Sequence, residues 1–240
     1  MSKFKTADFN EDLEWSQQGH LFLAAHFYPQ YAYNGQFVFC DRTDKQERGA
    51  LLIQKKLHID TIIQRDTALN AICIDEKIVK GYYKKFTLET HSITSTPKMP
   101  VGLGDGCVMQ SSADEMIYCF PTRKKCNCVP LSRQWQKCTH PISAVELYII
   151  DLQTLQQWFS QVYARYPWRS IRNKGYWTHV RIVPILDVYQ GIGHEHIIKN
   201  IIKEAEGLKR EICYFEDATG QIALFPYKNK LAYFIRQKKE

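Results

Sequence analysis

The chain has 240 residues, of which 45% are hydrophobic and 13% aromatic, enough for one large hydrophobic core. Its 32 basic and 25 acidic residues give a formal net charge of +7, a modest excess that is compatible with a polyanionic partner but does not identify one. No apolar run approaches the roughly 20 residues that span a bilayer, and the opening stretch MSKFKTADFNEDLEW lacks the apolar segment of a signal peptide. We therefore expect a cytoplasmic protein without membrane contact, whose eight cysteines are free thiols or metal ligands rather than disulfides.

The first part of the chain is predicted to begin with a helix and to continue through a hairpin into a second helix. Apolar residues recur at helical spacing over residues 11–28. Asn34 and Gly35, between aromatic-rich segments, are typical of a two-residue hairpin turn. Residues 43–57 carry acids near the start and lysines near the end, as a helix prefers.

The middle of the chain is predicted to consist mainly of strands. HIDTII (58–63) and AICIDEKIV (71–79) are separated by a short polar turn, which predicts an antiparallel pair. KKFTLETHSI (84–93), EMIYCF (115–120) and AVELYII (144–150) add three further strands. These segments predict an α+β protein built around a mixed sheet.

The last third is predicted to alternate helix, strand and helix. DLQTLQQWFSQVY (151–163) starts with an acid suited to an N-cap and continues as an amphipathic helix. YWTHVRIVPILDV (176–188) is expected to be a strand, and HEHIIKNIIKEAEGLKREI (194–212) a helix.

Three charges interrupt the apolar run NAICIDEKIV, although a buried charge is costly unless it is paired or bound to a metal. Residues two apart in a strand project to the same side, so Asp75 and Lys77 share one face and Glu76 points the other way. If the preceding strand pairs here, Asp60 lies beside Asp75, and the two carboxylates repel each other unless a cation sits between them. Mg²⁺ suits such a pair. The alternative is a salt bridge between Asp75 and Lys77 on a solvated face; the strongly apolar neighbours favour a site.

This arrangement resembles the PD-(D/E)XK nuclease superfamily, in which an acid ends one strand and the next carries acid–any–lysine. Here the pattern reads Ile59-Asp60 and then Asp75-Glu76-Lys77, with Ile59 in place of the proline of the family name. LLIQKKLHID, FTLETHS, SSADEMIYCF and AVELYIIDLQTLQQWF are also similar to segments of such nucleases, so the resemblance covers about residues 40–185. It implies a restriction-endonuclease-like αβββαβ core, with a mixed central sheet flanked by helices.

The resemblance implies roles for four residues. Asp60 and Asp75 would be metal ligands, joined by the backbone carbonyl of Glu76. Lys77 would be the catalytic lysine, which orients or deprotonates the attacking water or stabilises charge forming on the phosphate. The expected cofactor is Mg²⁺, with Mn²⁺ as a substitute.

Three further polar residues have open roles. Glu47, on the predicted second helix, and Glu89, on the strand after the lysine, are candidate additional metal ligands; a surface or structural carboxylate is the alternative for each. Gln54 is a candidate either to hydrogen-bond near the metal water or to cap the helix end.

CNCVPLSRQWQKCTH concentrates thiols, a histidine and basic residues in one short segment. The candidate ligands of a structural Zn²⁺ are Cys126, Cys128, Cys138 and His140. The candidate nucleic-acid contacts in and beside this segment are Arg123, Lys124, Lys125, Arg133, Trp135 and Lys137. The alternative is an exposed basic loop with incidental thiols.

Other motifs favour structural roles. GLGDG (102–106) lacks the ending of a phosphate-binding loop, so a turn is expected. His194 and His196 are more typical of solvated or structural histidines than of a metal site. Trp177 and Thr178 resemble a late strand of related nucleases, without a predicted role.

These observations predict a single nuclease domain over residues 1–240. It would have a core at about 40–185, a Cys-rich basic insertion at about 121–141 and a C-terminal α/β extension at 186–240. The predicted activity is metal-dependent hydrolysis of DNA phosphodiester bonds, best matched by a type II-like restriction endonuclease that acts as a homodimer. Two alternatives remain: a phage or repair-type nuclease or junction resolvase of the same fold, and a non-catalytic nucleic-acid-binding protein with a zinc-stabilised basic loop.

Overall fold

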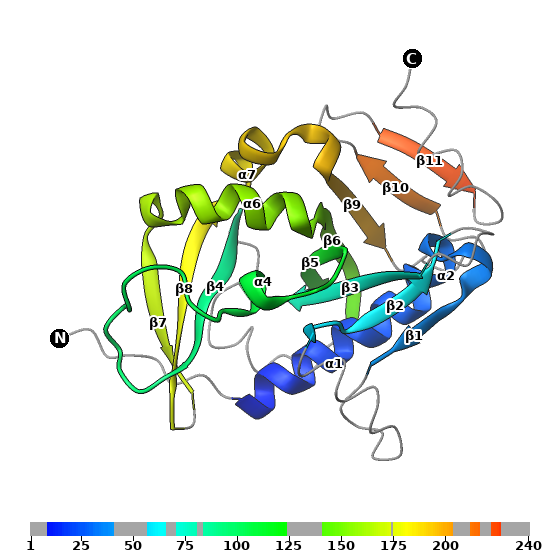
Figure 1. Ribbon diagram of the computed structural model, residues 1–240. Coiled ribbons are helices and arrows are strands. Elements are labelled where there is room, and N and C mark those ends of the chain that lie inside the picture. The colour runs from blue at the N-terminus through cyan, green and yellow to red at the C-terminus, as the bar shows by residue number, and fades with distance from the viewer. Residues whose placement is uncertain are drawn as a thin grey trace.

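The computed structural model describes residues 9–40, 57–65, 71–80, 84–123, 141–173, 175–203, 212–216 and 222–226. Within these ranges the chain forms two β-sheets and several helices (Figure 1). No described helix is long and apolar enough to cross a membrane.

The larger sheet has eight strands in the order β1-β2-β3-β5-β6-β9-β10-β11. Its strands are β1 (Phe37–Phe39), β2 (Thr61–Gln64), β3 (Ala71–Ile78), β5 (Glu115–Arg123), β6 (Ile142–Asp151), β9 (Ile197–Lys203), β10 (Ile212–Glu216) and β11 (Ile222–Pro226). Only β3 and β5 pair in parallel, and every other neighbouring pair is antiparallel. The sheet is therefore mixed, as predicted.

The smaller sheet has three antiparallel strands in the order β4-β8-β7. They are β4 (Lys85–Thr94), β8 (Trp177–Pro184) and β7 (Trp168–Arg172). The β4–β8 register shifts between Glu89 and His91 and again before Thr94, so β4 is irregular in its second half. In Figure 1 this sheet stands on the opposite side of β3 and β5 from β10 and β11.

Five α-helices and three 3₁₀ turns complete the described fold. The α-helices are α1 (Phe9–His26), α2 (Tyr28–Tyr31), α4 (Cys107–Gln110), α6 (Leu152–Val162) and α7 (Ile185–Ile192). The 3₁₀ turns are η1 (Tyr33–Gly35), η2 (Tyr163–Arg165) and η3 (His194–His196). Asp151 caps α6 as predicted, because its side chain accepts a hydrogen bond from the Thr154 amide.

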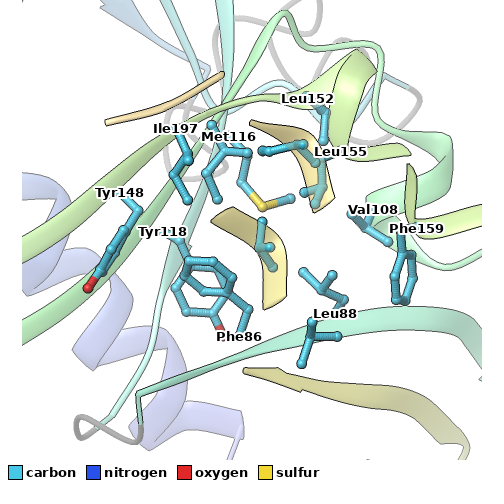
Figure 2. Close-up of a cluster of buried hydrophobic side chains, with 14 of the residues drawn as sticks. Phe86, Leu88, Val108, Met116, Tyr118, Tyr148, Leu152, Leu155, Phe159 and Ile197 are labelled. Carbon is cyan, nitrogen blue, oxygen red and sulfur yellow. The ribbon is translucent and has the colours of Figure 1, made fainter. Parts of the chain in front are cut away.

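The two faces of the large sheet bury two separate clusters. On one face, Met116 and Tyr118 of β5 pack with Phe86 of β4 and with α6 (Figure 2). The rings of Phe86 and Tyr118 lie 4.7 Å apart. On the other face, Ile74 and Ile117 pack with α1 and α2. Since side chains alternate along a strand, β3 presents successive residues to different environments.

Much of the predicted architecture is confirmed. The chain is α+β with a mixed sheet, β2 and β3 pair antiparallel, and the helices predicted over residues 11–28 and 151–163 are present. The connection from β3 to its parallel neighbour β5 contains β4 and the four-residue α4. The helix predicted over residues 43–57 lies outside the described residues, apart from its last position.

Three local predictions are wrong. Asn34 and Gly35 do not join two strands; they belong to η1, which follows α2, and β1 pairs with β2 instead. The aromatic residues before the turn pack into the core as a short helix, which overrides the hairpin signal. Residues 197–203, predicted as helix, form β9 between β6 and β10, where β-branched isoleucines suit a buried strand. The end of the predicted strand 176–188 is the start of α7.

Gly106 shows how closely the segment before α4 packs on β4. A Cβ there would lie 2.2 Å from the carbonyl oxygen of Glu89, and the Gly106 amide donates to the Thr90 carbonyl at 3.0 Å. Gly106→Ala is therefore expected to lower the free energy of unfolding by roughly 1–3 kcal/mol in a denaturant titration. Gly175→Ala is the control: it has open space but a φ of +85°, and should cost about 1 kcal/mol through backbone strain alone. An unchanged midpoint for Gly106→Ala would contradict the close contact.

Candidate active site

Asp75 and Lys77 lie on the face of β3 that looks towards the smaller sheet. Their register partners on β5 are Met116 and Tyr118, which belong to the core cluster on that side. Asp75 is only 3% exposed. The alternation predicted from the sequence is therefore present, and it places an acid and a lysine together in an otherwise apolar setting.

Asp60 is held beside Asp75 by the backbone. Its carboxylate oxygen Oδ2 accepts a hydrogen bond from the amide of Glu76 at 2.8 Å. Its own amide donates to the Ile74 carbonyl at 2.8 Å, and its carbonyl accepts from Cys40 at the same distance. These bonds fix Asp60 at the start of β2, one position before the regular β2–β3 pairing begins.

The ionised form of the Asp75 carboxyl is unfavourable in the folded protein. Burial raises its pKa, the positive charge of Lys77 opposes that rise, and the negative charge of Asp60 adds to it, so that the pKa stands at about 7 instead of 3.8. Its Oδ2 is buried and has no hydrogen-bond partner in the described part of the chain. A cation at this oxygen would supply the missing partner and favour the ionised form.

Lys77 remains protonated at neutral pH in this environment. Burial alone would lower the pKa of its ammonium group, but Cys107, when ionised, and the carboxylates of Asp75, Glu89 and Asp60 raise it. At neutral pH the Cys107 thiol is not ionised, so there the attraction comes from the carboxylates. The net effect raises the pKa above its ordinary value. Lys77 is therefore a partly buried cation near several negative groups.

Cys107, His58 and Ser111 are site neighbours that sequence reasoning missed. Cys107 begins α4, and its Sγ lies 3.1 Å from Nδ1 of His58. Ser111, just after α4, donates its hydroxyl proton to the His58 carbonyl at 3.1 Å, and its hydroxyl lies near enough to Asp75 to lower the pKa of that carboxyl. Burial raises the pKa of the Cys107 thiol to about 11, so the thiol is neutral. No sequence pattern joins these residues, since the long connection after β4 brings them together.

Glu89 contributes negative charge to the same region. It raises the pKa of both Lys77 and Cys107, and its carboxylate accepts a hydrogen bond from the Ser92 hydroxyl. Among the residues that the structure describes, no group of three or more His, Cys, Asp or Glu side chains converges on one point. A ligand role for Glu89 stays a prediction, and the geometry offers two carboxylates, Asp60 and Asp75.

Glu76 occupies a different environment on the opposite face of β3. Its Oε1 accepts hydrogen bonds from the hydroxyls of Tyr28, at 2.6 Å, and Thr61. Its Oε2 lies 2.6 Å from Nδ1 of His20 on α1. Burial would raise the pKa of Glu76, but the charge and N–H of His20 and the two hydroxyls outweigh it and lower that pKa. The side chain thus ties α1 and α2 to the site strand; its carbonyl as a metal ligand stays a prediction.

Arg123 is the only described member of the predicted nucleic-acid contacts. Its guanidinium lies 4.6 Å from the ring of Trp15 and donates to Gln18 at 3.3 Å, so it packs on α1. Outside the described residues lie Glu47, Gln54, Lys124, Lys125, Cys126, Cys128, Arg133, Trp135, Lys137, Cys138 and His140. The zinc site and the basic loop therefore stay predictions.

The remaining candidates have structural partners. His196 Nδ1 lies 3.2 Å from the carboxylate of Asp151, and the ring of His194 packs on Tyr189. The hydroxyl of Thr178 accepts a hydrogen bond from Asn173 at 2.9 Å. These contacts agree with the structural roles expected for the two histidines.

Comparison with known proteins identified no protein family, no characterised protein and no solved structure that matches this chain.

Proposed function

We propose that the chain is a Mg²⁺-dependent nuclease that hydrolyses phosphodiester bonds of DNA at Asp60, Asp75 and Lys77. One observation carries this proposal: the buried oxygen of Asp75, which has no hydrogen-bond partner in the described part of the chain, lies in a region that also contains a second carboxylate and a partly buried lysine. Perturbed titratable groups with such specific partners are characteristic of functional sites.

The residues present fit a divalent cation with hard oxygen ligands. Asp75 has a buried oxygen without a hydrogen-bond partner in the described part of the chain, and Asp60 supplies a second carboxylate whose Oδ2 accepts a hydrogen bond from the Glu76 amide. Two carboxylates with remaining positions for water and substrate are a common Mg²⁺ arrangement. Bound there, the cation would lower the pKa of a coordinated water and neutralise phosphoryl oxygens.

In this proposal Lys77 acts as a cation that binds the scissile phosphate, which is one of the roles that the sequence left open. Because its pKa is raised, it would bind the scissile phosphate as a cation and stabilise the charge that develops there.

Within this activity, a type II-like restriction endonuclease with a PD-(D/E)XK core remains our proposal, with a homodimer as its working form. What supports it is the antiparallel β2–β3 pair that carries Asp60, Asp75 and Lys77, followed by β5 in parallel beside β3. The alternatives of a repair-type nuclease or junction resolvase use the same residues, so the experiments below do not depend on this choice.

The direct test is cleavage of supercoiled plasmid in millimolar Mg²⁺, and separately in Mn²⁺. The unaltered protein should convert the plasmid to nicked or linear form, and EDTA should stop it. Lys77→Met should reduce the rate about 100-fold or more, as expected for loss of a group that stabilises developing charge. Lys203→Met, which removes the same charge from an exposed position at the end of β9, is the matched control and should cut normally.

Two results would overturn the proposal. One is plasmid that stays supercoiled with the unaltered protein in both metals. The other is cutting by Lys77→Met at the rate of the control.

A further inference from the structure

Positive charge is concentrated in one stretch of the chain. Residues 152–186 contain no aspartate or glutamate but carry Arg165, Arg169, Arg172, Lys174 and Arg181. This stretch forms α6, η2, β7 and β8, so the charge gathers around the smaller sheet. The imbalance is far stronger than the modest net charge of the whole chain suggests.

The arginines of this stretch divide into one that is structural and three that are exposed. Arg181 donates to the Tyr166 carbonyl at 2.6 Å and lies 5.5 Å from the ring of Tyr163, so it supports the fold. Arg165, Arg169 and Arg172 are exposed, and the described part of the chain shows no ion pair for them. Their charge is therefore available to a partner.

Alternation along β7 assigns these side chains to different faces. Trp168, Ser170 and Arg172 share one face, and Arg169 lies on the other. Across the strand pair, Arg172 faces Trp177 of β8, with its guanidinium 5.8 Å from the indole ring. Trp168 is 45% exposed although it is a large aromatic residue. We call Trp168, Arg172 and Trp177 the arginine–tryptophan face.

The arginine–tryptophan face is connected to the candidate active site by the chain between β4 and α4. The Pro97 carbonyl accepts a hydrogen bond from Ser170, which lies between Trp168 and Arg172 on β7. Further along, Gly104 packs against the ring of His91 on β4. The segment then enters α4, whose first residue, Cys107, is a neighbour of Lys77. Figure 1 shows this green loop passing β7, β8 and β4 before it reaches α4.

We propose that the arginine–tryptophan face docks a nucleic-acid strand that contains unpaired bases. Arg172, at one end of β7, and Arg165, which precedes the other end, would contact phosphates, and the exposed indole of Trp168 would stack on a base. Arginine with an accessible aromatic ring is the combination that binds single strands, because stacking needs a base whose flat face is free. An acidic peptide would pair with the arginines but has no base that could stack on Trp168. This inference rests on the proposed nuclease function and specifies its substrate class as DNA with a single-stranded segment, which within that function favours the repair-type nuclease or junction resolvase over a restriction endonuclease that cuts intact duplex.

The test measures binding without cleavage, by fluorescence anisotropy in EDTA. One labelled oligonucleotide is used single-stranded and, in parallel, annealed as a duplex. The unaltered protein should bind the single strand more tightly. Trp168→Leu should weaken binding of the single strand about 10-fold and leave the duplex unchanged, because only the stacking is lost.

Arg172→Ala and Arg169→Ala form a matched pair, since each removes one exposed arginine from β7 but from opposite faces. Arg172→Ala should weaken binding several-fold and lower the slope of log K against log salt by about 0.7 for the single strand. Arg169→Ala should have a clearly smaller effect. Thermal melting of each variant establishes that it is folded.

Three results would overturn this inference. The first is tighter binding of the duplex than of the single strand, and the second is an unchanged affinity of Trp168→Leu for the single strand. The third is an equal loss of affinity in Arg172→Ala and Arg169→Ala. These failures are separable from failure of the nuclease proposal. If the unaltered protein cuts plasmid but the variants bind normally, only the docking face is wrong. If binding falls as expected but no metal supports cutting, the docking face stands and the nuclease assignment is wrong.

Discussion

Asp75→Asn is expected to make the protein more stable at pH 8 without divalent metal, and to abolish its Mg²⁺-dependent cleavage. The pKa of Asp75 is about 7 instead of 3.8, which corresponds to roughly 4 kcal/mol of unfavourable energy for its ionised form in the folded state. That pKa already includes the attraction of Lys77. An asparagine keeps a polar group in place but removes the charge, so we expect a gain of about 2 kcal/mol, or roughly 4–8 °C in Tm.

The sign of this effect depends on pH. Between pH 3.8 and about 7 the folded protein holds a proton on Asp75 that the unfolded chain has lost, so stability falls as pH rises through this window. Above it, both states are ionised and the full cost is present. The advantage of Asp75→Asn should therefore be largest at pH 8, smaller at pH 5 and absent below about pH 4.

Thermal melting at these pH values, with and without Mg²⁺, tests the expectation. Mg²⁺ should raise the Tm of the unaltered protein at pH 8 and leave that of Asp75→Asn unchanged, because a ligand that binds only the folded state stabilises it. Asp105→Asn, at an exposed position before α4, is the control and should alter neither quantity. A lower Tm for Asp75→Asn at pH 8 would show that the buried carboxylate is well satisfied and needs no cation.

Glu76→Gln, one residue further along the same strand, is expected to have the opposite effect on stability. The Glu76 carboxylate accepts hydrogen bonds from Tyr28 and Thr61 and contacts His20, and its side chain is fully buried. Breaking such a pair leaves the partners without their charge complement, and we expect a loss of about 3 kcal/mol in the free energy of unfolding. Denaturant unfolding at neutral pH measures it.

The pH dependence provides a second readout for this variant. Because the pKa of Glu76 is lowered, its stabilisation is present above the ordinary glutamate value of 4.5 and is lost as the pH falls below it. The difference between Glu76→Gln and the unaltered protein should therefore narrow in acid. Tyr28→Phe, which removes a single donor, should cost only about 1–2 kcal/mol. If Glu76→Gln lost no more than Tyr28→Phe, the carboxylate would not be what holds α1 and α2 to β3.

The two variants together separate a site residue from a structural one. Asp75→Asn should gain stability and lose the response to Mg²⁺, whereas Glu76→Gln should lose stability and keep that response. Functional sites commonly retain buried, unfavourable charge at a cost in stability. Two neighbouring acids with opposite behaviour would identify which face of β3 serves that purpose.

The fold could be predicted where local patterning and burial agree. The strands at 71–79, 115–120 and 144–150 and the helix at 151–163 each have a periodicity that matches their final environment. The prediction of a helix failed at residues 197–203, where isoleucines at helical spacing pair as β9 instead. Residue spacing alone does not distinguish one face of a helix from a strand inside a sheet. The hydrogen bonds of such a strand come from neighbouring strands, and the spacing of its own residues does not show that these strands are there.

For the candidate site, the sequence by itself determined the placement of Asp75 and Lys77 on one side of a strand and Glu76 on the other. That result needs only the two-residue period of a strand. Only the tertiary structure decided which residues surround each face of β3. Asp60 is held at Asp75 by backbone hydrogen bonds, and the connection after β4 returns Cys107 to Lys77. Such contacts join residues far apart in the chain, so no local pattern encodes them, and they place Lys77 near negative groups that raise its pKa.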